Sequence, residues 1–465
     1  MAFYFGVNMV KILEFANEVL WGVPTMILIL VVGILLSIRS RFAQIRLFPM
    51  AVRKFIGSFR NKGQNEDGMS GYRALCTALA ATVGTGNIAG VAGAIAIGGP
   101  GVVFWMWVSA FLGMITKMAE VTLAVVYRRK NTAGEYAGGT MHMITLGLDK
   151  KYHFLAYIYA FFGVVASFGV GNATQVNAVM DGFKSIANGF QLSFGVKQTL
   201  ILGMIMAILI TVAFRSGVNS VGNWAEKLIP VASALYILLA IGVLVMRYWA
   251  IPDAFAAIVS GAFHPRSVTC GMLSSMLLTL RVGMSRGVFT NEAGMGTAAI
   301  AHASAASVTP VQQGLMGMIE VFLDTVVICT LTALVILCSD ISIAYGTDPG
   351  MKLTLDAFSS VYGNWCRIVL TVLSCVFAFA TILGWGLYGA RCAQFLLGDR
   401  VWNYFVWVQA FAVIIGAVMN TAVVWVIAEI LNALMVLPNL FALLLLMPRF
   451  IAEIDCYQNK KVHSS

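Results

Sequence analysis

The sequence is short of charge. Only 11% of its 465 residues are Asp, Glu, Lys or Arg, against about 25% in an ordinary soluble domain, and 60% are hydrophobic. With a mean hydropathy of +0.86, the solvent for most of the chain is lipid. An ordinary soluble protein is therefore excluded, and so is any domain count taken from length alone.

Motifs for metal, redox and nucleotide chemistry are also lacking. The eight cysteines form no CxxC pair and the five histidines have no metal-ligand spacing, so the cysteines are interpreted as small hydrophobes. No HExxH, GxSxG or nucleotide-binding string is present, which argues against an intramembrane enzyme and a primary pump. The net charge of +10 comes from short segments between apolar runs, so we expect no nucleic-acid partner.

Long apolar runs dominate what is present. A transmembrane helix needs about 20 mainly apolar residues, and this criterion predicts eleven spans. They are expected at 18–38, 74–97, 101–127, 153–183, 198–214, 226–248, 270–302, 312–338, 365–397, 402–420 and 423–447. The first run is too long for a signal-peptide core and is taken as a retained helix. Residues 252–265 are expected at the membrane interface, and 339–363 form an outer loop with room for a short helix.

Basic residues between the runs predict the orientation. Lys and Arg concentrate in the first loop (39–73), the third loop (128–151) and the tail (449–461). All three fall on one side when eleven spans are counted, and basic loops face the cytoplasm. We therefore expect a multi-pass protein of the inner (plasma) membrane, with the N-terminus outside and the C-terminus cytoplasmic.

Two spans are interrupted in a way that the others are not. Residues 82–90 read TVGTGNIAG and residues 289–297 read FTNEAGMGT. Glycine beside Asn or Thr at mid-membrane depth breaks a helix and exposes backbone amides and carbonyls, which survive there only when they line a cavity or are buried in protein. The alternative is a pair of Gly-rich faces that pack helices together.

The two interruptions occupy matching positions. With the first span set aside, ten remain in two sets of five, and each interruption lies in the first helix of its set. An offset of five spans reverses topology, so the halves, about 74–248 and 270–447, are predicted to be inverted repeats of one transport domain. Its parts are expected at 18–38 for the extra helix, 74–214 for the first repeat, and 226–420 with 423–447 for the second.

Four separated strings carry a family resemblance. They are ALCTALAATVGTGNIAGVAGAIAIGGPGVVFWMWVSAFLGM from residue 74, GVGNATQ at 169–175, FTNEAGMG at 289–296 and FAFATILGW at 377–385. Together they resemble the alanine/glycine:cation symporter family of sodium- or proton-coupled amino-acid carriers. The resemblance implies an all-α membrane protein with a leucine-transporter-like core of five plus five helices, two of them broken, behind one peripheral helix.

A zwitterionic substrate at the bilayer midplane needs donors for its carboxylate and acceptors for its ammonium. Backbone amides in the first interruption, at the N-terminus of a half-helix, can serve the carboxylate, and carbonyls in the second can serve the ammonium. The resemblance adds polar contacts from the fourth and ninth spans and a Trp that limits side-chain size, with simple packing as the alternative for that Trp. The expected substrate-binding residues are Thr82, Gly84, Thr85, Gly86, Asn87, Gln175, Phe289, Thr381 and Trp385.

A sodium ion requires about five or six oxygens, which carbonyls and hydroxyls supply without full negative charge. The resemblance implies carbonyls of Ala80, Val83 and Phe377 and the hydroxyl of Thr381 as ligands. Relatives usually carry Ser where this chain has Ala380, so coupling to protons stays open. Two further departures, GGTMHM at 138–143 and Ala390, bear on selectivity and gating.

Ionisable residues within the spans have their own interpretations. Lys117 and Glu120, three residues apart, are expected to pair with each other. Glu292, inside the second interruption, is expected to cap freed backbone amides.

A second set of ionisable residues lies on the eighth span and beyond. Glu320 and Asp324 share a helix face and are expected to bind a gating Arg281 or Arg286, or else to hold a proton. Glu429 in the last span has no evident partner in the sequence.

The sequence thus predicts a secondary symporter that imports alanine or glycine with Na⁺ by alternating access. The alternatives are a proton-coupled carrier and a carrier of a larger neutral amino acid such as serine or glutamine. A channel is disfavoured because no repeated pore loops or charged rings occur. We expect no cofactor besides the coupling ion, and no partner beyond the amino acid, the ion and membrane lipid.

Overall fold

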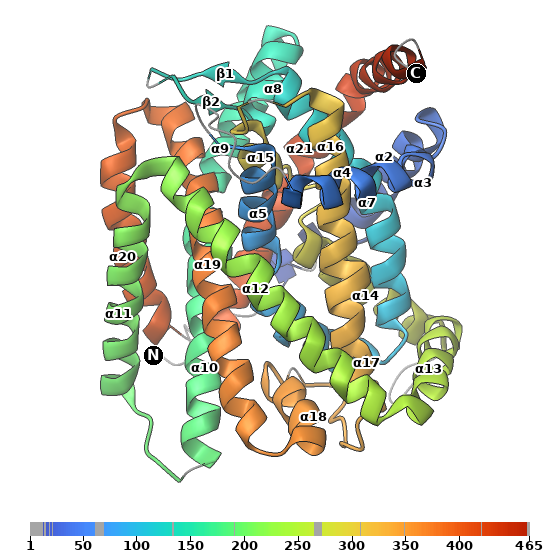
Figure 1. Cartoon of the computed structure of the whole chain (residues 1–465), viewed down its shortest axis with the longest axis vertical. Coiled ribbons are helices and arrows are strands. Elements are labelled where there is room, and N and C mark those ends of the chain that lie inside the picture. The colour runs from blue at the N-terminus through green and yellow to red at the C-terminus, as the bar shows by residue number, and fades with distance from the viewer. Residues whose placement is uncertain are drawn as a thin grey trace.

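The architecture is all helical apart from one short hairpin in this computed structural model (Figure 1). The structure describes residues 13, 15–17, 19–20, 22–60, 69–132, 134–189, 191–264, 272–306, 308–347, 349–419 and 421–462. The start of the predicted first span and residues 270–271 of the seventh lie outside this set.

The N-terminal helices precede the two repeats. Helix α2 (Val23–Arg39) begins at a proline, and its last turn carries Arg39. A left-handed turn leads to α3 (Ala43–Arg46) and then to α4 (Phe48–Arg60), which has one apolar face and one basic face. The sequence predicted only a basic loop here, whereas the structure contains two helices.

The segment predicted as the first repeat begins with a broken helix. Helix α5 (Gly71–Thr82) ends where Val83 and Gly84 adopt extended backbone, a 3-10 turn η1 (Thr85–Asn87) follows, and α6 (Ala89–Gly98) continues at an angle of 55°. The interruption predicted at 82–90 is therefore a break in the helix.

The rest of the first repeat is a helical succession with one hairpin. It comprises α7 (Val102–Val126), β1 (Arg129–Lys130) antiparallel to β2 (Tyr136–Ala137), α8 (Thr140–Gly147), the 3-10 turn η2 (Lys150–Tyr152), α9 (His153–Phe168), the π-helical turn η3 (Gly169–Ala173), α10 (Thr174–Gly189), α11 (Val196–Arg215) and α12 (Gly217–Met246). The π-helical turn lies within the GVGNATQ motif of the fourth predicted span, just before Gln175.

The segment predicted as the second repeat also contains a break near its start. After the 3-10 turn η4 (Tyr248–Ala250) and the short helix α13 (Ile251–Phe263), α14 (Met272–Asn291) is followed by non-helical backbone and then α15 (Ala298–Ala303). The chain continues through α16 (Pro310–Val321), the π-helical η5 (Phe322–Cys329), α17 (Thr330–Cys338), α18 (Lys352–Tyr362), α19 (Trp365–Leu397), α20 (Val401–Val418) and α21 (Thr421–Val462). The loop 339–363 does contain a short helix, as its composition allowed.

Many of these helices are fit to cross a membrane. Among the described residues, eight are long and apolar enough by length and composition, and α5 with α6 makes a ninth if the bent pair is one span. Helices α2 and α13 are apolar but shorter. The count of eleven spans and the inverted repeat remain predictions.

Continuous helices pack around the centre of the molecule. Helices α11 and α20 pack against each other along one side, and α12 crosses the front of the molecule (Figure 1). Helix α7 packs against α14, α15 and α16, while α19 packs against α5, α9 and α12. Both broken helices are thus enclosed by continuous ones, and their breaks are buried.

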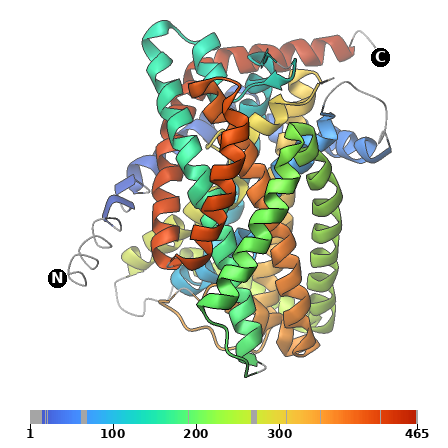
Figure 2. The same ribbon diagram turned by 90° about the vertical axis from the view of Figure 1, so that its left-hand side faces the viewer.

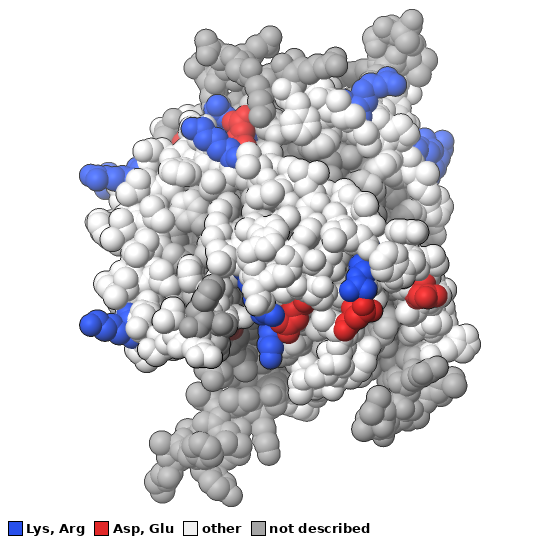
Figure 3. Space-filling view, turned by 60° about the horizontal axis from the view of Figure 1, so that its bottom comes forward, with Lys and Arg blue, Asp and Glu red and all other residues white. Residues whose placement is uncertain are grey.

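The two ends of the molecule differ. The hairpin and α8 lie at the end shown at the top of Figure 1, whereas α13 and α18 lie at the bottom. Helix α21 contains Pro438 and Pro448, and proline bends a helix. Figure 2 shows the last part of α21 turned across the top of the molecule. Figure 3 brings the lower end of Figure 1 forward and shows a mainly uncharged surface with a few scattered Lys, Arg, Asp and Glu side chains.

Candidate functional site

The first helix break is held open by one asparagine. The Asn87 side-chain oxygen accepts a hydrogen bond from the Gly84 amide at 2.9 Å. Asn87 and the intervening Thr85 are each only 1% exposed. A side chain thus replaces the helical hydrogen bond that the break removes, which keeps this backbone non-helical inside the protein.

Gln175 reaches into this break from α10. Its carboxamide oxygen accepts from the Thr85 hydroxyl at 2.8 Å and from the Thr85 amide at 3.4 Å. Its nitrogen donates to the Val170 carbonyl at 3.3 Å, inside the π-helical turn η3. Two residues predicted to bind substrate, 90 positions apart in sequence, therefore touch. The amides of Gly84 and Thr85, predicted to receive a carboxylate, donate here to side-chain oxygens.

The predicted cation ligands also converge from two helices. The Thr381 hydroxyl of α19 donates to the Ala80 carbonyl of α5 at 2.9 Å. A methyl group on Gly84 would lie 2.7 Å from the same hydroxyl, so Thr381 borders the break as well. Val83 lies at the break on α5, and Phe377 is buried one turn before Thr381 on α19.

Two predicted substrate residues meet at Gly86. A methyl group built there would face Phe289 at 3.8 Å and Thr290 at 3.7 Å, so the first break lies against the end of α14. The remaining predicted residue of the first motif, Thr82, is buried and donates to the Ala78 carbonyl of its own helix at 3.2 Å.

The second break depends on left-handed backbone. Glu292, Gly294 and Gly296 have φ of 54°, 92° and 73°, conformations that favour glycine at the last two positions. The freed amides of Gly294 and Gly296 donate to Glu120 of α7 at 2.9 and 3.1 Å. The prediction that Glu292 caps freed amides is therefore wrong, since Glu292 accepts instead from the Thr297 hydroxyl at 2.6 Å.

The pairing predicted for Lys117 is wrong as well. Its ammonium bonds the Glu320 carboxylate at 3.3 Å, and both side chains are fully buried. Glu320 also contacts His302 at 3.0 Å, and Asn439 donates to Glu120 at 2.6 Å. Spacing along one helix placed Lys117 beside Glu120, but the hydrogen-bond partners of both side chains lie on neighbouring elements.

Arg286, one of the two arginines predicted to gate Glu320 and Asp324, has a different partner. Arg286 pairs with Glu429 at 3.2 Å, and Asn17 donates to the same carboxylate at 2.6 Å. Glu429 thus has the partners that the sequence did not reveal. The contacts of Asp324 are neutral, as described next.

Asp324 is the main site feature that sequence analysis did not connect to the first break. It lies in the π-helical η5, fully buried, and accepts from the Asn87 amide at 2.6 Å and from the Thr325 hydroxyl at 2.8 Å. Asn291 at the end of α14 donates to Thr325 at 3.2 Å. A carboxylate without a basic partner in the described chain thus joins both helix breaks, and an Asp within a span was the only signal for it.

Trp385 lies deeper in the packing than the motif implied. It is 1% exposed, its ring lies 5.8 Å from that of Tyr388, and a methyl group on Gly171 would overlap it at 2.1 Å. Trp385 is also a hydrogen-bond partner of Glu292 at the second break. It therefore borders the second break and packs against η3.

A polar cavity of about 400 Å³ lies at the hairpin end of the molecule, where Glu135, Lys130 and Arg391 line it. The Arg391 guanidinium pairs with Glu135 at 2.9 Å although Arg391 itself is buried. Arg128 donates to carbonyls that follow α15, and the amide of Ala306 donates to the Met69 carbonyl at 2.8 Å. The ends of both broken helices that lie nearest the hairpin are thus tied together.

The fold and the site together define a multi-pass membrane transporter. Two broken helices bring neutral hydroxyl, amide and carbonyl groups into a buried centre, and the described residues contain no cluster able to hold a catalytic metal. The solved structures that it resembles agree with this class. One is MhsT in complex with L-phenylalanine (TM-score 0.57, 15% identity, 82% of this chain and 90% of that chain), and another is Mhp1, a nucleobase-cation-symport-1 family transporter (TM-score 0.51, 12% identity, 81% and 75%).

The chain belongs to the sodium:alanine symporter family, because the sequence model of that family matches residues 7–465. It is 37% identical to the sodium/alanine symporter AgcS of Methanococcus maripaludis and 38% identical to an uncharacterized transporter of Haemophilus influenzae, each over 97% of both chains. It is also 35% identical to the probable sodium/glutamine symporter GlnT of Bacillus subtilis, over 97% of this chain and 91% of that one. The resemblance identified from the four motifs is confirmed, and the protein is a transporter rather than an enzyme.

Proposed function

We propose that this protein imports a small neutral amino acid, alanine or glycine, together with Na⁺ by alternating access around its two broken helices. Family membership supports amino-acid symport, and the name of the archaeal relative supports alanine. The observation that carries the sodium part is the contact between the Thr381 hydroxyl and the Ala80 carbonyl.

The substrate part of the proposal rests on the first break. The Gly84 and Thr85 amides are at the start of a half-helix, where the dipole favours an anion. Both now donate to neutral side-chain oxygens of Asn87 and Gln175, which a substrate carboxylate can replace with a charge-assisted bond. Phe289 and Thr290 lie against Gly86 and leave room for only a small side chain.

The sodium part rests on two oxygens held 2.9 Å apart from different helices. A cation between them would be shared by α5 and α19, so its binding would favour the conformation in which these helices meet. The carbonyls of Val83 and Phe377 are the further proposed ligands. Ala380 supplies no hydroxyl, so the site would use fewer side-chain oxygens than in most relatives.

The test is uptake of labelled alanine and glycine into proteoliposomes of the purified protein. We expect accumulation under an inward Na⁺ gradient and none under a proton gradient or without a gradient. Recovery of chemically unchanged substrate would exclude metabolism. Saturable uptake that ignores every gradient would contradict the symport mechanism.

A pair of matched variants isolates the sodium ligand. Thr381→Val removes the hydroxyl and keeps the shape of the side chain. We expect the apparent affinity for Na⁺ to fall about tenfold, which corresponds to a loss of roughly 1.4 kcal/mol in binding free energy. Thr371→Val on the same helix removes a buried hydroxyl that has no hydrogen-bond partner among the described residues, and should leave Na⁺ affinity unchanged. Equal effects of the two would remove Thr381 from the cation site.

A second candidate is coupling to protons through Asp324. Its carboxylate is buried, has only neutral partners and bonds the first break through Asn87. If protons drive uptake, Asp324→Asn should abolish gradient-driven accumulation and retain substrate exchange. Sodium-driven uptake that survives this substitution would eliminate the candidate.

Substrate size has its own alternative. The relative GlnT is named as a sodium/glutamine symporter, so glutamine and serine belong in the competition panel. We propose the smaller substrate because Gly86 faces an aromatic ring rather than open space. Stronger competition by glutamine than by alanine would reverse this choice.

We further propose that the hairpin end faces the cytoplasm. The first and third loops and the tail carry the basic residues that orient such proteins in the inner membrane. The polar cavity at Arg391 and Glu135 would then be the inner exit from the site.

A further inference from the structure

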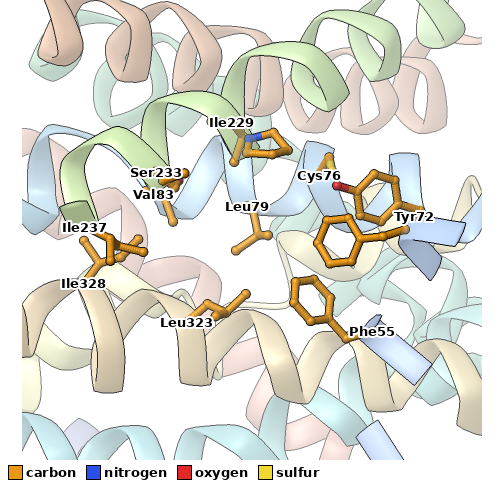
Figure 4. Close-up of a pocket in the computed structure, with 13 residues that line it drawn as sticks. Phe55, Tyr72, Cys76, Leu79, Val83, Ile229, Ser233, Ile237, Leu323 and Ile328 are labelled. Carbon is orange, nitrogen blue, oxygen red and sulfur yellow. The ribbon is translucent and has the colours of Figure 1, made fainter. Parts of the chain in front are cut away.

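We propose that an anionic phospholipid binds in an apolar cavity beside the first broken helix, with one acyl chain inside the cavity and the headgroup at its basic end. The cavity has a volume of about 300 Å³ and lies between α4, α5, α12 and η5 (Figure 4). This proposal does not depend on the identity of the substrate or the coupling ion.

The lining of the cavity selects for hydrocarbon. Of its thirteen residues, only Tyr72, Cys76 and Ser233 carry a side-chain oxygen or sulfur, and the remainder are aliphatic, aromatic or proline. An apolar cavity of this kind does not hold ordered water, because water there lacks hydrogen-bond partners. The helices around it belong to the membrane-embedded part of the chain, so acyl chains are the hydrocarbon at hand.

The cavity is open toward the bilayer. Ala234 of α12 and Phe59 of α4 line it and are exposed, Phe59 by 42%. Its shape suits a chain rather than a compact ligand. From Tyr72 to Val83 it follows α5 for eleven residues, about 16 Å at the helical rise of 1.5 Å per residue. Figure 4 places Phe55 and Tyr72 at one end and Val83, Ile237 and Ile328 at the other.

Positive charge gathers at the Phe55 and Tyr72 end. Arg53 and Lys54 precede Phe55 on the amphipathic helix α4, and Lys54 bonds Gln312 at the start of α16. Arg73, next to Tyr72, is paired with Glu226 at 2.8 Å. Lys227 is exposed and lies one turn before Pro230, which lines the cavity. Among the described residues there, four basic residues against one acidic residue favour an anionic headgroup.

The deep end of the cavity lies against the first helix break and η5. Val83 begins the first helix break, and Leu323 and Ile328 flank Asp324 in η5. A bound chain would therefore pack between two elements that must move relative to α12 during transport.

The experiment is photocrosslinking in vesicles of phosphatidylethanolamine and phosphatidylglycerol, the latter carrying a diazirine near the end of one acyl chain. Labelled peptides are mapped by mass spectrometry. We expect labelling of peptides that contain Leu79, Val83 or Ile237 to exceed that of the exposed face of α11. A phosphatidylcholine probe with the same chain should label the cavity far less. Equal labelling by the two probes would overturn the headgroup assignment, and labelling no stronger than on α11 would overturn the site.

Two variants with matched controls complete the test. Ala234→Phe fills the opening and should abolish cavity labelling, whereas Ala256→Phe, at an exposed alanine of α13, should not. Replacing Arg53 and Lys227 together by Gln should reduce labelling about tenfold, whereas replacing Lys197 and Arg215 of α11 together by Gln should not. The readout needs no transport, so its failure is distinguishable from failure of the proposed function. Undiminished labelling in both cavity variants would refute the proposal.

Discussion

Glycine at position 84 marks a close approach of three elements in the candidate site. An added methyl group would lie 2.7 Å from the Thr381 hydroxyl and 3.2 Å from the Gln175 oxygen. The backbone there is extended, so the constraint is space rather than conformation. The motif therefore requires glycine at this position because three elements meet around it.

Gly84→Ala should reduce uptake by more than about tenfold, because one of two polar site residues has to move. Gly90→Ala on α6 introduces the same methyl group into open space and should leave uptake within about twofold of the parent. Both rates are measured as initial alanine uptake, normalised to protein extracted from the membrane. Unchanged uptake in Gly84→Ala would contradict the position of the site.

Trp385 shows how a residue can border a site and also support the core. Trp385→Ala should lower the free energy of unfolding by about 3 kcal/mol or more, because it leaves a cavity against Gly171 and Tyr388. It should also let leucine compete with alanine for uptake. Trp365→Ala on the same helix removes a ring that is 54% exposed and should change neither thermal stability nor competition.

At the scale of elements, the second break is stabilised from α7. Glu120 receives the two amides that the break frees and the Asn439 amide of α21, so one carboxylate ties α7, the break and α21 together. Lys117 on the same helix bonds Glu320 of α16. These buried contacts hold the elements around the break in one arrangement.

Glu120→Gln should lower the free energy of unfolding by about 3 kcal/mol, because the three donors that share Oε1 would face a neutral oxygen, and the new NH₂ group would lie at the buried Oε2 position, which has no hydrogen-bond partner in the described chain. Glu453→Gln removes a partly exposed carboxylate paired with Arg449 at 2.7 Å and should cost less than about 1 kcal/mol. Thermal unfolding in detergent compares the two. A smaller shift for Glu120→Gln than for Glu453→Gln would mean that the break is stabilised elsewhere.

The sequence predicted the helices and their two breaks better than the contacts between helices. TVGTGN and FTNEAGMG predicted both breaks, because glycine and polar residues in an apolar run are a local signal. The π-helical turns η3, which precedes Gln175, and η5, which contains Asp324, were not predicted, although GVGNA in η3 also combines glycine with a polar residue. Helix α4 was likewise missed, because its charges suggested only a basic loop.

At the scale of the whole molecule, the predicted orientation can be tested with one thiol. Cys456 on α21 is the exposed cysteine of the described chain. In a Cys270→Ser background, a membrane-impermeant maleimide should label Cys456 in inside-out vesicles and not in right-side-out vesicles. The reverse pattern would place the hairpin end and the C-terminus outside the cell.

The sequence by itself determined that this is a membrane carrier with two broken helices, because hydropathy and glycine content act locally and every short segment displays them. Four motifs also identified the family. Only the tertiary structure decided which buried groups meet. It placed Thr381 against Ala80, Gln175 against Thr85 and Asp324 against Asn87. It also paired Lys117 with Glu320 rather than with Glu120. Spacing along one helix reveals a shared face, but contacts between residues far apart in sequence depend on how whole helices pack.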